Sequence, residues 1–157
     1  MKEVEILLVE DDPNDVELTL RVLRKNNLAN KIHVVGDGEE ALDFLFCRGK
    51  YADRQLDNPP RVVFLDLKLP KLNGLEVLKE LKSDPRTKPI PVVVMTSSRE
   101  QRDLVQGYRL GVNSYIQKPI AFEEFQMVIK DLGYYWLIVN QQPPSETFEG
   151  QTQEGAR

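Results

Sequence analysis

The 157-residue sequence contains one cysteine, Cys47, and has no apolar run long enough to span a membrane. A lone cysteine cannot form an internal disulfide, so the composition favours a reducing compartment. Charged residues near the N-terminus lead directly into an apolar stretch, and we therefore expect no signal peptide. The formal net charge is −4 and no basic block is present, which argues against nucleic-acid binding. These absences predict a soluble, cytoplasmic protein.

The length suits one compact domain, and apolar runs of strand length alternate with segments of helical period. Strict alternation of this kind, with nearly continuous apolar strands, predicts an α/β fold: a parallel sheet with helices on both faces, doubly wound in the order 2-1-3-4-5. The expected strands are Val4–Val9, Ile32–Val35, Arg61–Leu65, Ile90–Met95 and Ser114–Gln117.

Two segments depart from this pattern. The loop Arg48–Pro60 is longer than a usual connection, which is typical of functional or mobile loops. The segment 141–157 is polar and rich in proline, glycine and glutamine, so we expect a disordered tail. The predicted organisation is one domain over residues 1–140 followed by that tail.

The residues that could bind a ligand or react lie at the ends of the predicted strands. In a doubly wound sheet, ligands bind beyond the carboxyl ends of the strands, at the point where strand order reverses. Glu10 and Asp11 end the first strand and Asp66 the third, while the fourth ends at Thr96 and the fifth is followed by Lys118. The topology therefore predicts that three carboxylates, one hydroxyl and one lysine converge on one mouth.

The chemistry of this set points to phosphoryl transfer. Clustered carboxylates repel one another unless a cation holds them, and Mg²⁺ binds one or two carboxylates together with phosphate oxygens. A carboxylate can also attack phosphorus and form an aspartyl phosphate. A metal ion and a lysine would then neutralise the charge on the transferred group, and the hydroxyl of Thr96 could hydrogen-bond one of its oxygens.

Each residue also has a purely structural interpretation. Asp66 alone could be a polar turn residue, and the acidic run after the first strand could cap the following helix, a role we expect for Asp12. Asp12 is thus a second choice as a metal ligand. The joint occurrence of suitable residues at four strand ends favours a reactive site. Elsewhere the structural interpretation is preferred: Cys47 is expected to be a small buried apolar residue, and His33 a surface residue at a strand edge.

Four motifs together resemble the receiver domain of two-component response regulators, the CheY-like members of the flavodoxin-like fold. They are Val9–Asp12, Asp66–Gly74, Met95–Ser97 and Lys118-Pro119. The resemblance covers the chain from about Val4 to Asn140, with the motifs in the family order and spacing.

The resemblance implies a role for each strand-end residue. Asp66 would be the phosphoacceptor, and Mg²⁺ would be held by Glu10, Asp11 and Asp66 together with the backbone carbonyl of Lys68. Catalysis would be limited to self-phosphorylation from a donor and self-dephosphorylation by water.

The resemblance also implies a conformational switch. Thr96 would be the switch hydroxyl, and Lys118, before a cis proline at Pro119, would pair with the phosphoryl group. Tyr115 occupies the place of the aromatic ring that turns inward in this family. Lys68 and Ser98, two residues past Asp66 and Thr96, would influence the lifetime of the phosphorylated state.

The implied partner is a sensor histidine kinase. The long loop and the aromatic run Tyr134–Leu137 are similar to those of single-domain regulators paired with phytochrome kinases. An alternative is a phosphorelay carrier that passes the group to a histidine phosphotransfer protein. An aspartyl-phosphate phosphohydrolase is disfavoured because Lys68 stands where that class needs an acid. A DNA-binding regulator is disfavoured because the sequence ends without an output domain.

The last expected helix, from Phe122 to about Asn140, has apolar residues on two faces. At about 100° per residue, one stripe forms the predicted core face: Phe125, Val128, Ile129, Leu132, Trp136 and Val139. Met127, Tyr134, Leu137 and Ile138 fall on the opposite side. One apolar face is enough for a surface helix, so the second one predicts a homodimer or partner surface.

Overall fold

The computed structural model describes residues 4–28, 31–119 and 121–148. Five strands form one parallel sheet in the order β2-β1-β3-β4-β5, which confirms the predicted doubly wound topology. The strands are β1 (Ile6–Val9), β2 (Ile32–Val35), β3 (Val62–Leu65), β4 (Val92–Thr96) and β5 (Ser114–Gln117). β1 lies between β2 and β3, with Val9 in register with Val35 and Leu65, so these three strands end at the same level.

Three of the five α-helices begin after a residue whose side chain caps them, namely Asp12, Asp37 and Asn73. The helices are α1 (Pro13–Lys25), α2 (Gly38–Leu45), α3 (Gly74–Ser83), α4 (Gln101–Leu110) and α5 (Phe122–Tyr134), with a short 3₁₀ helix, η1 (Gly49–Tyr51), after α2. The side chain of Asp12 accepts a hydrogen bond from the backbone of Asn14, which confirms its predicted role as a helix cap. Within the described parts of the chain, no helix is both long and apolar enough to cross a bilayer.

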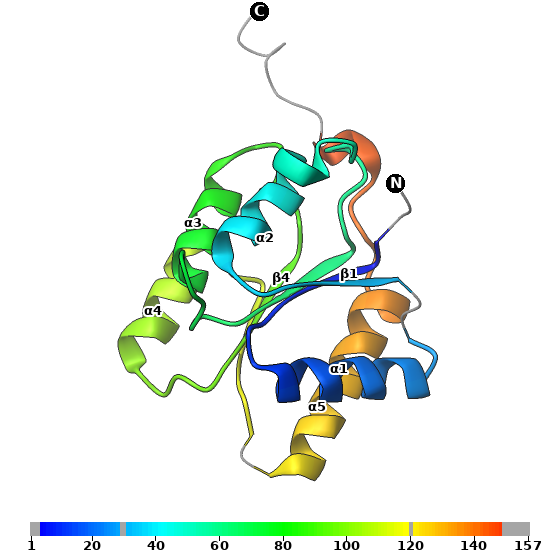
Figure 1. Cartoon of the computed structure of the whole chain (residues 1–157), viewed down its shortest axis with the longest axis vertical. Coiled ribbons are helices and arrows are strands. Elements are labelled where there is room, and N and C mark those ends of the chain that lie inside the picture. The colour runs from blue at the N-terminus through cyan, green and yellow to red at the C-terminus, as the bar shows by residue number, and fades with distance from the viewer. Residues whose placement is uncertain (1–3, 29–30, 120, 149–157) are drawn as a thin grey trace, which may run out of the picture.

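Alternate strand residues build two hydrophobic layers. Leu7, Val63 and Val94 pack in the layer that also contains the apolar residues of α2 and α3. Leu8 and Phe64 point the opposite way and pack with α1 and α5. Figure 1 shows the corresponding arrangement, with α1 and α5 on one side of the sheet and α2, α3 and α4 on the other. Burial on both faces explains why the strands are nearly continuous apolar runs.

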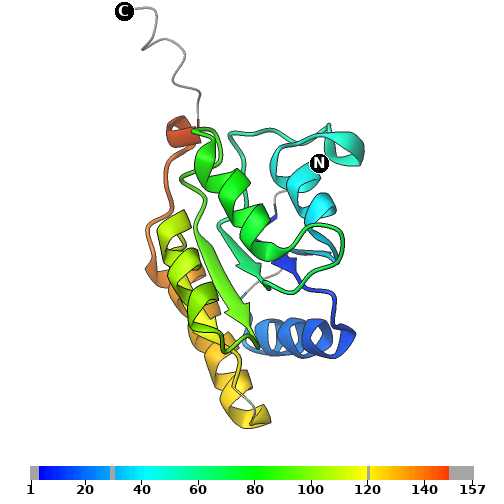
Figure 2. The ribbon, with the colours of Figure 1, turned by 90° about the vertical axis from the view of Figure 1, so that its left-hand side faces the viewer.

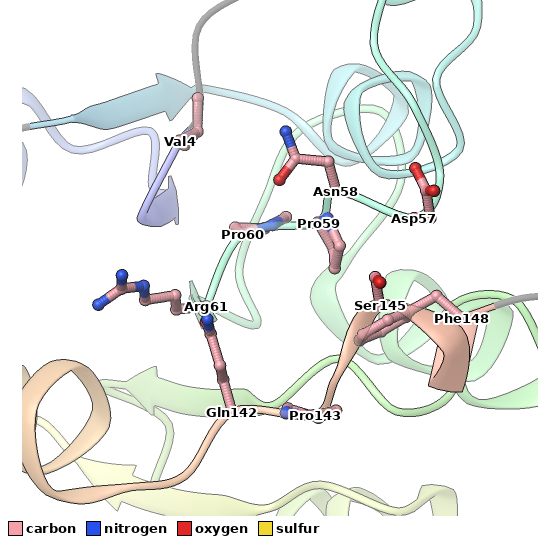
Figure 3. A pocket seen from close by; sticks show the side chains of 10 residues that line it. All are labelled: Val4, Asp57, Asn58, Pro59, Pro60, Arg61, Gln142, Pro143, Ser145 and Phe148. Carbon is pink, nitrogen blue, oxygen red and sulfur yellow. The ribbon is translucent and has the colours of Figure 1, made fainter.

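The prediction of a disordered tail is wrong for residues 141–148, and residues 149–157 lie outside the described part of the chain. After α5 the chain runs to the end of the sheet where the strands begin (Figure 2) and forms the 3₁₀ helix η3, Ser145–Phe148. Phe148 is only 3 % exposed and belongs to the core layer of α2 and α3. Figure 3 shows the tail facing the segment before β3 across a small cavity. Burial of one aromatic side chain fixes a segment whose average composition is polar.

The last helix confirms part of the predicted second apolar face and corrects the rest. Met127, Tyr134 and Ile138 are 64 %, 55 % and 58 % exposed, as expected. Leu137 is only 7 % exposed, whereas Val139, predicted for the core, is 50 % exposed. The reason is that α5 continues as a π-helix, η2 (Tyr135–Val139). Its wider turn changes the angle between successive side chains, so a 100° period no longer assigns the faces.

The long loop after α2 is anchored by Tyr51, which is buried. Its hydroxyl donates to Glu40 at 2.5 Å and lies 2.9 Å from Nε2 of His33. His33 also stacks on Phe44, with ring centroids 4.8 Å apart. His33 lies on the edge strand β2 as predicted, but it is half-buried and not a surface residue, because Tyr51 of the loop contacts it. Cys47 is half-buried with a left-handed backbone, so it is not the fully buried apolar residue that we expected.

Candidate functional site

The predicted strand-end residues meet at the carboxyl edge of the sheet. Glu10 and Asp66 are 5 % and 7 % exposed, at the ends of β1 and β3. Asp11 is exposed, and single carboxylate oxygens of Glu10, Asp11 and Asp66 lie within 4.8 Å of one another. An all-carboxylate set with one exposed member suits a hard divalent cation that keeps some of its water. This donor set fits a divalent metal.

Lys118, just past β5, lies at the centre of the acidic group. Its Nζ atom is 2.6 Å from Oε1 of Glu10 and 3.2 Å from Oδ2 of Asp66. It is also 2.8 Å from Oδ2 of Asp15, a residue that our sequence reasoning missed. The signal was available: Asp15 lies four residues after Asp11, in the first turn of a helix that starts at this mouth.

The charges of the site are unbalanced, because one ammonium faces three carboxylates. Burial alone would lower the pKa of Lys118, but its hydrogen bonds to Asp15 and Glu10 and the charge of Asp66 raise it instead. Burial raises the pKa of Glu10 to about 7, although its hydrogen bond with Lys118 acts in the opposite direction. The lysine therefore stays charged, whereas the ionised form of the buried Glu10 is disfavoured by burial and by the nearby charge of Asp66. A divalent cation would relieve the repulsion between these carboxylates.

The loop after β3 holds Asp66 in place. The backbone N–H of Lys68 donates to Oδ1 of Asp66 at 3.3 Å, while the role predicted for its carbonyl remains a prediction. Gly74, the first residue of α3, donates its backbone N–H to the carbonyl of Leu67. A Cβ atom at Gly74 would lie 2.3 Å from the carbonyl oxygen of Asp66. Only glycine therefore allows α3 to start so close to the backbone of Asp66.

The residues predicted to form the switch lie on β4 and β5. Thr96 is fully buried, and its Oγ1 accepts a hydrogen bond from the backbone of Ser98 at 3.1 Å. The Ser98 hydroxyl in turn donates to Asp103 of α4 at 2.6 Å. The hydroxyl of Tyr115 is buried and has no hydrogen-bond partner among the residues that the structure describes. The ring of Tyr115 occupies space that a Cβ atom at Gly107 would need, at 3.1 Å.

The cis peptide predicted before Pro119 is wrong. The described residues contain no cis peptide bond, so Lys118 and Pro119 are joined in the trans form, which X–Pro bonds favour by about 0.5–1 kcal/mol. Pro119 instead lines a cavity of about 520 Å³ beside the acidic group. Asp15 and Lys118 form its polar wall, and Phe122 and Phe125 of α5 contribute apolar surface.

Comparison with known proteins shows the family to which this chain is similar. Residues 6–130 match the model of the response regulator receiver domain. The chain is 40 % identical to the probable methanogenesis regulatory protein FilR2 of Methanothrix harundinacea, over 88 % of this chain and 86 % of that protein. It is 35 % identical to the Mn²⁺-bound form of response regulator Rcp1, known from Synechocystis, over 90 % of this chain and 99 % of that one, with a TM-score of 0.83. It is 50 % identical to the bacteriophytochrome response regulator AtBRR, over 90 % of this chain and all (100 %) of that one, with a TM-score of 0.69.

Proposed function

Because this chain belongs to the family of response regulator receiver domains, we propose that Asp66 accepts a phosphoryl group from a sensor histidine kinase in a Mg²⁺-dependent reaction. The observation that carries the proposal is the placement of Asp66. It is nearly buried, 3.2 Å from the Lys118 ammonium and within reach of the Glu10 and Asp11 carboxylates. Asp66 both contacts Lys118 and directly follows β3, at the start of the loop that leads to α3.

The chemistry needs no separate catalyst. A carboxylate oxygen of Asp66 forms a bond to phosphorus while the bond between phosphorus and the donor nitrogen breaks, which yields an acyl phosphate. Lys118 can donate N–H bonds to the phosphoryl oxygens, because its Nζ atom lies 3.2 Å from Oδ2 of Asp66. When bound by Glu10, Asp11, Asp66 and the Lys68 carbonyl, Mg²⁺ would neutralise the oxygens of the transferred group. In dephosphorylation, water would attack the phosphorus and the bond between phosphorus and the Asp66 oxygen would break, which releases inorganic phosphate and restores the carboxylate at the same site.

The change at Asp66 would be reported through hydrogen bonds that already connect β4 to α4. If Thr96 turned its hydroxyl toward the phosphoryl group, it would give up the bond from the Ser98 backbone. Ser98 is tied to Asp103, so α4 would be affected directly. The unpaired hydroxyl of Tyr115 supports its role in the same switch, since a buried polar group without a partner favours a move that supplies one.

Phosphoadduct formation tests the acceptor assignment. The protein is incubated with Mg²⁺ and acetyl phosphate and examined by intact mass. We expect one phosphoadduct on the wild type and on Asp12→Asn, whose side chain still caps α1. Asp66→Asn should remain unlabelled. Labelling of that variant would show that Asp66 is not the acceptor, and omission of Mg²⁺ should greatly slow the reaction.

We also propose a homodimer through three of the exposed apolar residues of α5 and η2, namely Met127, Tyr134 and Ile138. Three large side chains more than half exposed on one helical segment are unfavourable in water unless another surface covers them. Ile138→Lys should shift the sedimentation coefficient toward the monomer. The same charge at Val105 of α4 is the matched control. An unchanged coefficient in the Ile138 variant would contradict the proposal.

The partner kinase is proposed to be a phytochrome, by analogy with AtBRR. Phosphoryl transfer from a purified, autophosphorylated bacteriophytochrome to Asp66 is the test, with Asp66→Asn as the negative control. The proposal includes a cytoplasmic location, which suits the single Cys47, and no nucleic-acid partner, which suits the net charge of −4.

A further inference from the structure

Lys118 must hold its ammonium at one point in space to meet a phosphoryl group, yet lysine has a long, flexible stem. In the structure three carboxylates hold it: Glu10 at 2.6 Å, Asp15 at 2.8 Å and Asp66 at 3.2 Å. Two of these have other duties, since Glu10 belongs to the metal-binding group and Asp66 would carry the phosphoryl group. Asp15 does not belong to the metal-binding group.

We propose that Asp15 is a positioning residue for Lys118. It keeps the ammonium at the mouth when Glu10 turns to the metal and Asp66 becomes phosphorylated. This inference rests on the proposed function, in which Asp66 is the phosphoacceptor.

The position of Asp15 suits this role. It lies in the first turn of α1, and its carbonyl accepts a hydrogen bond from the buried Thr19 hydroxyl at 2.8 Å. Leu18 and Leu23 of the same helix are in the core layer shared with α5, so the backbone that carries Asp15 is firmly packed. Its carboxylate therefore approaches Lys118 from a rigid element, whereas Glu10 and Asp66 must rearrange during the reaction.

The number of hydrogen-bond donors on Lys118 also supports a positioning role for Asp15. The lysine ammonium has three N–H donors and no acceptor. With one donor kept on Asp15, two remain for phosphoryl oxygens once Glu10 and Asp66 are otherwise engaged. The side chain of Lys118 is only 10 % exposed, so water would replace a missing carboxylate poorly.

The test compares phosphorylation kinetics of the full chain with acetyl phosphate and Mg²⁺. Asp15→Asn should lower the second-order rate constant of adduct formation about tenfold to a hundredfold, the range expected for a misplaced reacting group. The Mg²⁺ dissociation constant, measured without acetyl phosphate, should change by less than about twofold, since Asp15 is not a ligand. Asp15→Glu should restore part of the rate. Glu17→Gln, at an exposed position of the same helix, should leave rate and affinity unchanged.

A double-mutant cycle separates positioning from a merely structural effect. In a Lys118→Met background, Asp15→Asn should cause no further loss, because the group that it positions is gone. An equal loss in both backgrounds, or no loss in the wild-type background, would overturn the inference while leaving Asp66 as the acceptor. An unlabelled wild type, or a labelled Asp66→Asn variant, would overturn the proposed function itself.

Discussion

In the metal-free protein, Glu10 should make the free energy of unfolding fall as the pH rises from the unfolded to the folded pKa of its side chain. Burial raises its pKa from the ordinary 4.5 to about 7 in the folded state. Between these values the folded chain binds more protons than the unfolded chain, so the free energy of unfolding falls as the pH rises. One pH unit corresponds to about 1.36 kcal/mol, and the full effect is therefore roughly 3 kcal/mol. The contribution is fully present below the unfolded pKa and is lost above about pH 7.

Another group that titrates near this window acts in the opposite direction. Burial lowers the pKa of His33 below its ordinary 6.5, so its contribution to stability grows as the pH rises toward that value. Lys118 does not interfere, because its pKa is raised from an ordinary value that already lies far above the window. The difference between the wild type and Glu10→Gln therefore isolates the carboxyl group of Glu10.

The assay is urea unfolding in EDTA at several values between about pH 5 and about pH 8. Relative to the wild type, Glu10→Gln should gain roughly 2–3 kcal/mol of stability between these limits, since the variant cannot ionise. Saturating Mg²⁺ should reduce the gain, because it binds the charged carboxylate and stabilises the wild type more at high pH. A difference in stability that does not change with pH, or that has the opposite sign, would refute the raised pKa of Glu10 and its burial in the folded state.

Three further substitutions test the packing around the site and the C-terminal segment. Gly74→Ala should destabilise the protein by roughly 1–3 kcal/mol and impair phosphorylation, because its Cβ would clash with backbone, whereas Gly36→Ala, in open space, should have little effect on urea unfolding. Leu137→Ala should lower the free energy of unfolding by roughly 2–4 kcal/mol, while Ile138→Ala should change it by less than about 0.5 kcal/mol; equal effects would contradict the faces assigned to η2. Phe148→Ala should lower the thermal midpoint and speed proteolysis at the C-terminal segment, and unchanged values for both would show that the 3₁₀ helix is not docked.

The site was largely predictable because it depends on topology. Once alternating strands and helices predicted a parallel sheet, the residues that end each strand had to share one edge. That reasoning identified Asp66, Glu10, Asp11, Thr96 and Lys118 without any knowledge of distances. Asp15 escaped it because it lies within a helix, where only the orientation of that helix over the mouth decides which side chain reaches the lysine.

The predictions that failed depend on contacts between distant segments. Leu137 is buried and Val139 is exposed, the opposite of the prediction, because α5 continues as a π-helix that a regular helical period does not reveal. Phe148 packs in the core layer of α2 and α3, and His33 contacts a loop nearly twenty residues further on. The average composition of a segment does not reveal that one of its residues packs against a distant part of the chain.

By itself, the sequence determined the alternation of strands and helices, the covering of both faces of the sheet, and the set of strand-end residues. These features follow from local periodicity and from the geometry that every parallel sheet shares. Only the tertiary structure decided that one lysine contacts three carboxylates, that burial raises the pKa of Glu10, and that the segment after α5 packs against the core. Each of these depends on distances of a few ångströms between residues far apart in the chain, where burial and charge decide the energy.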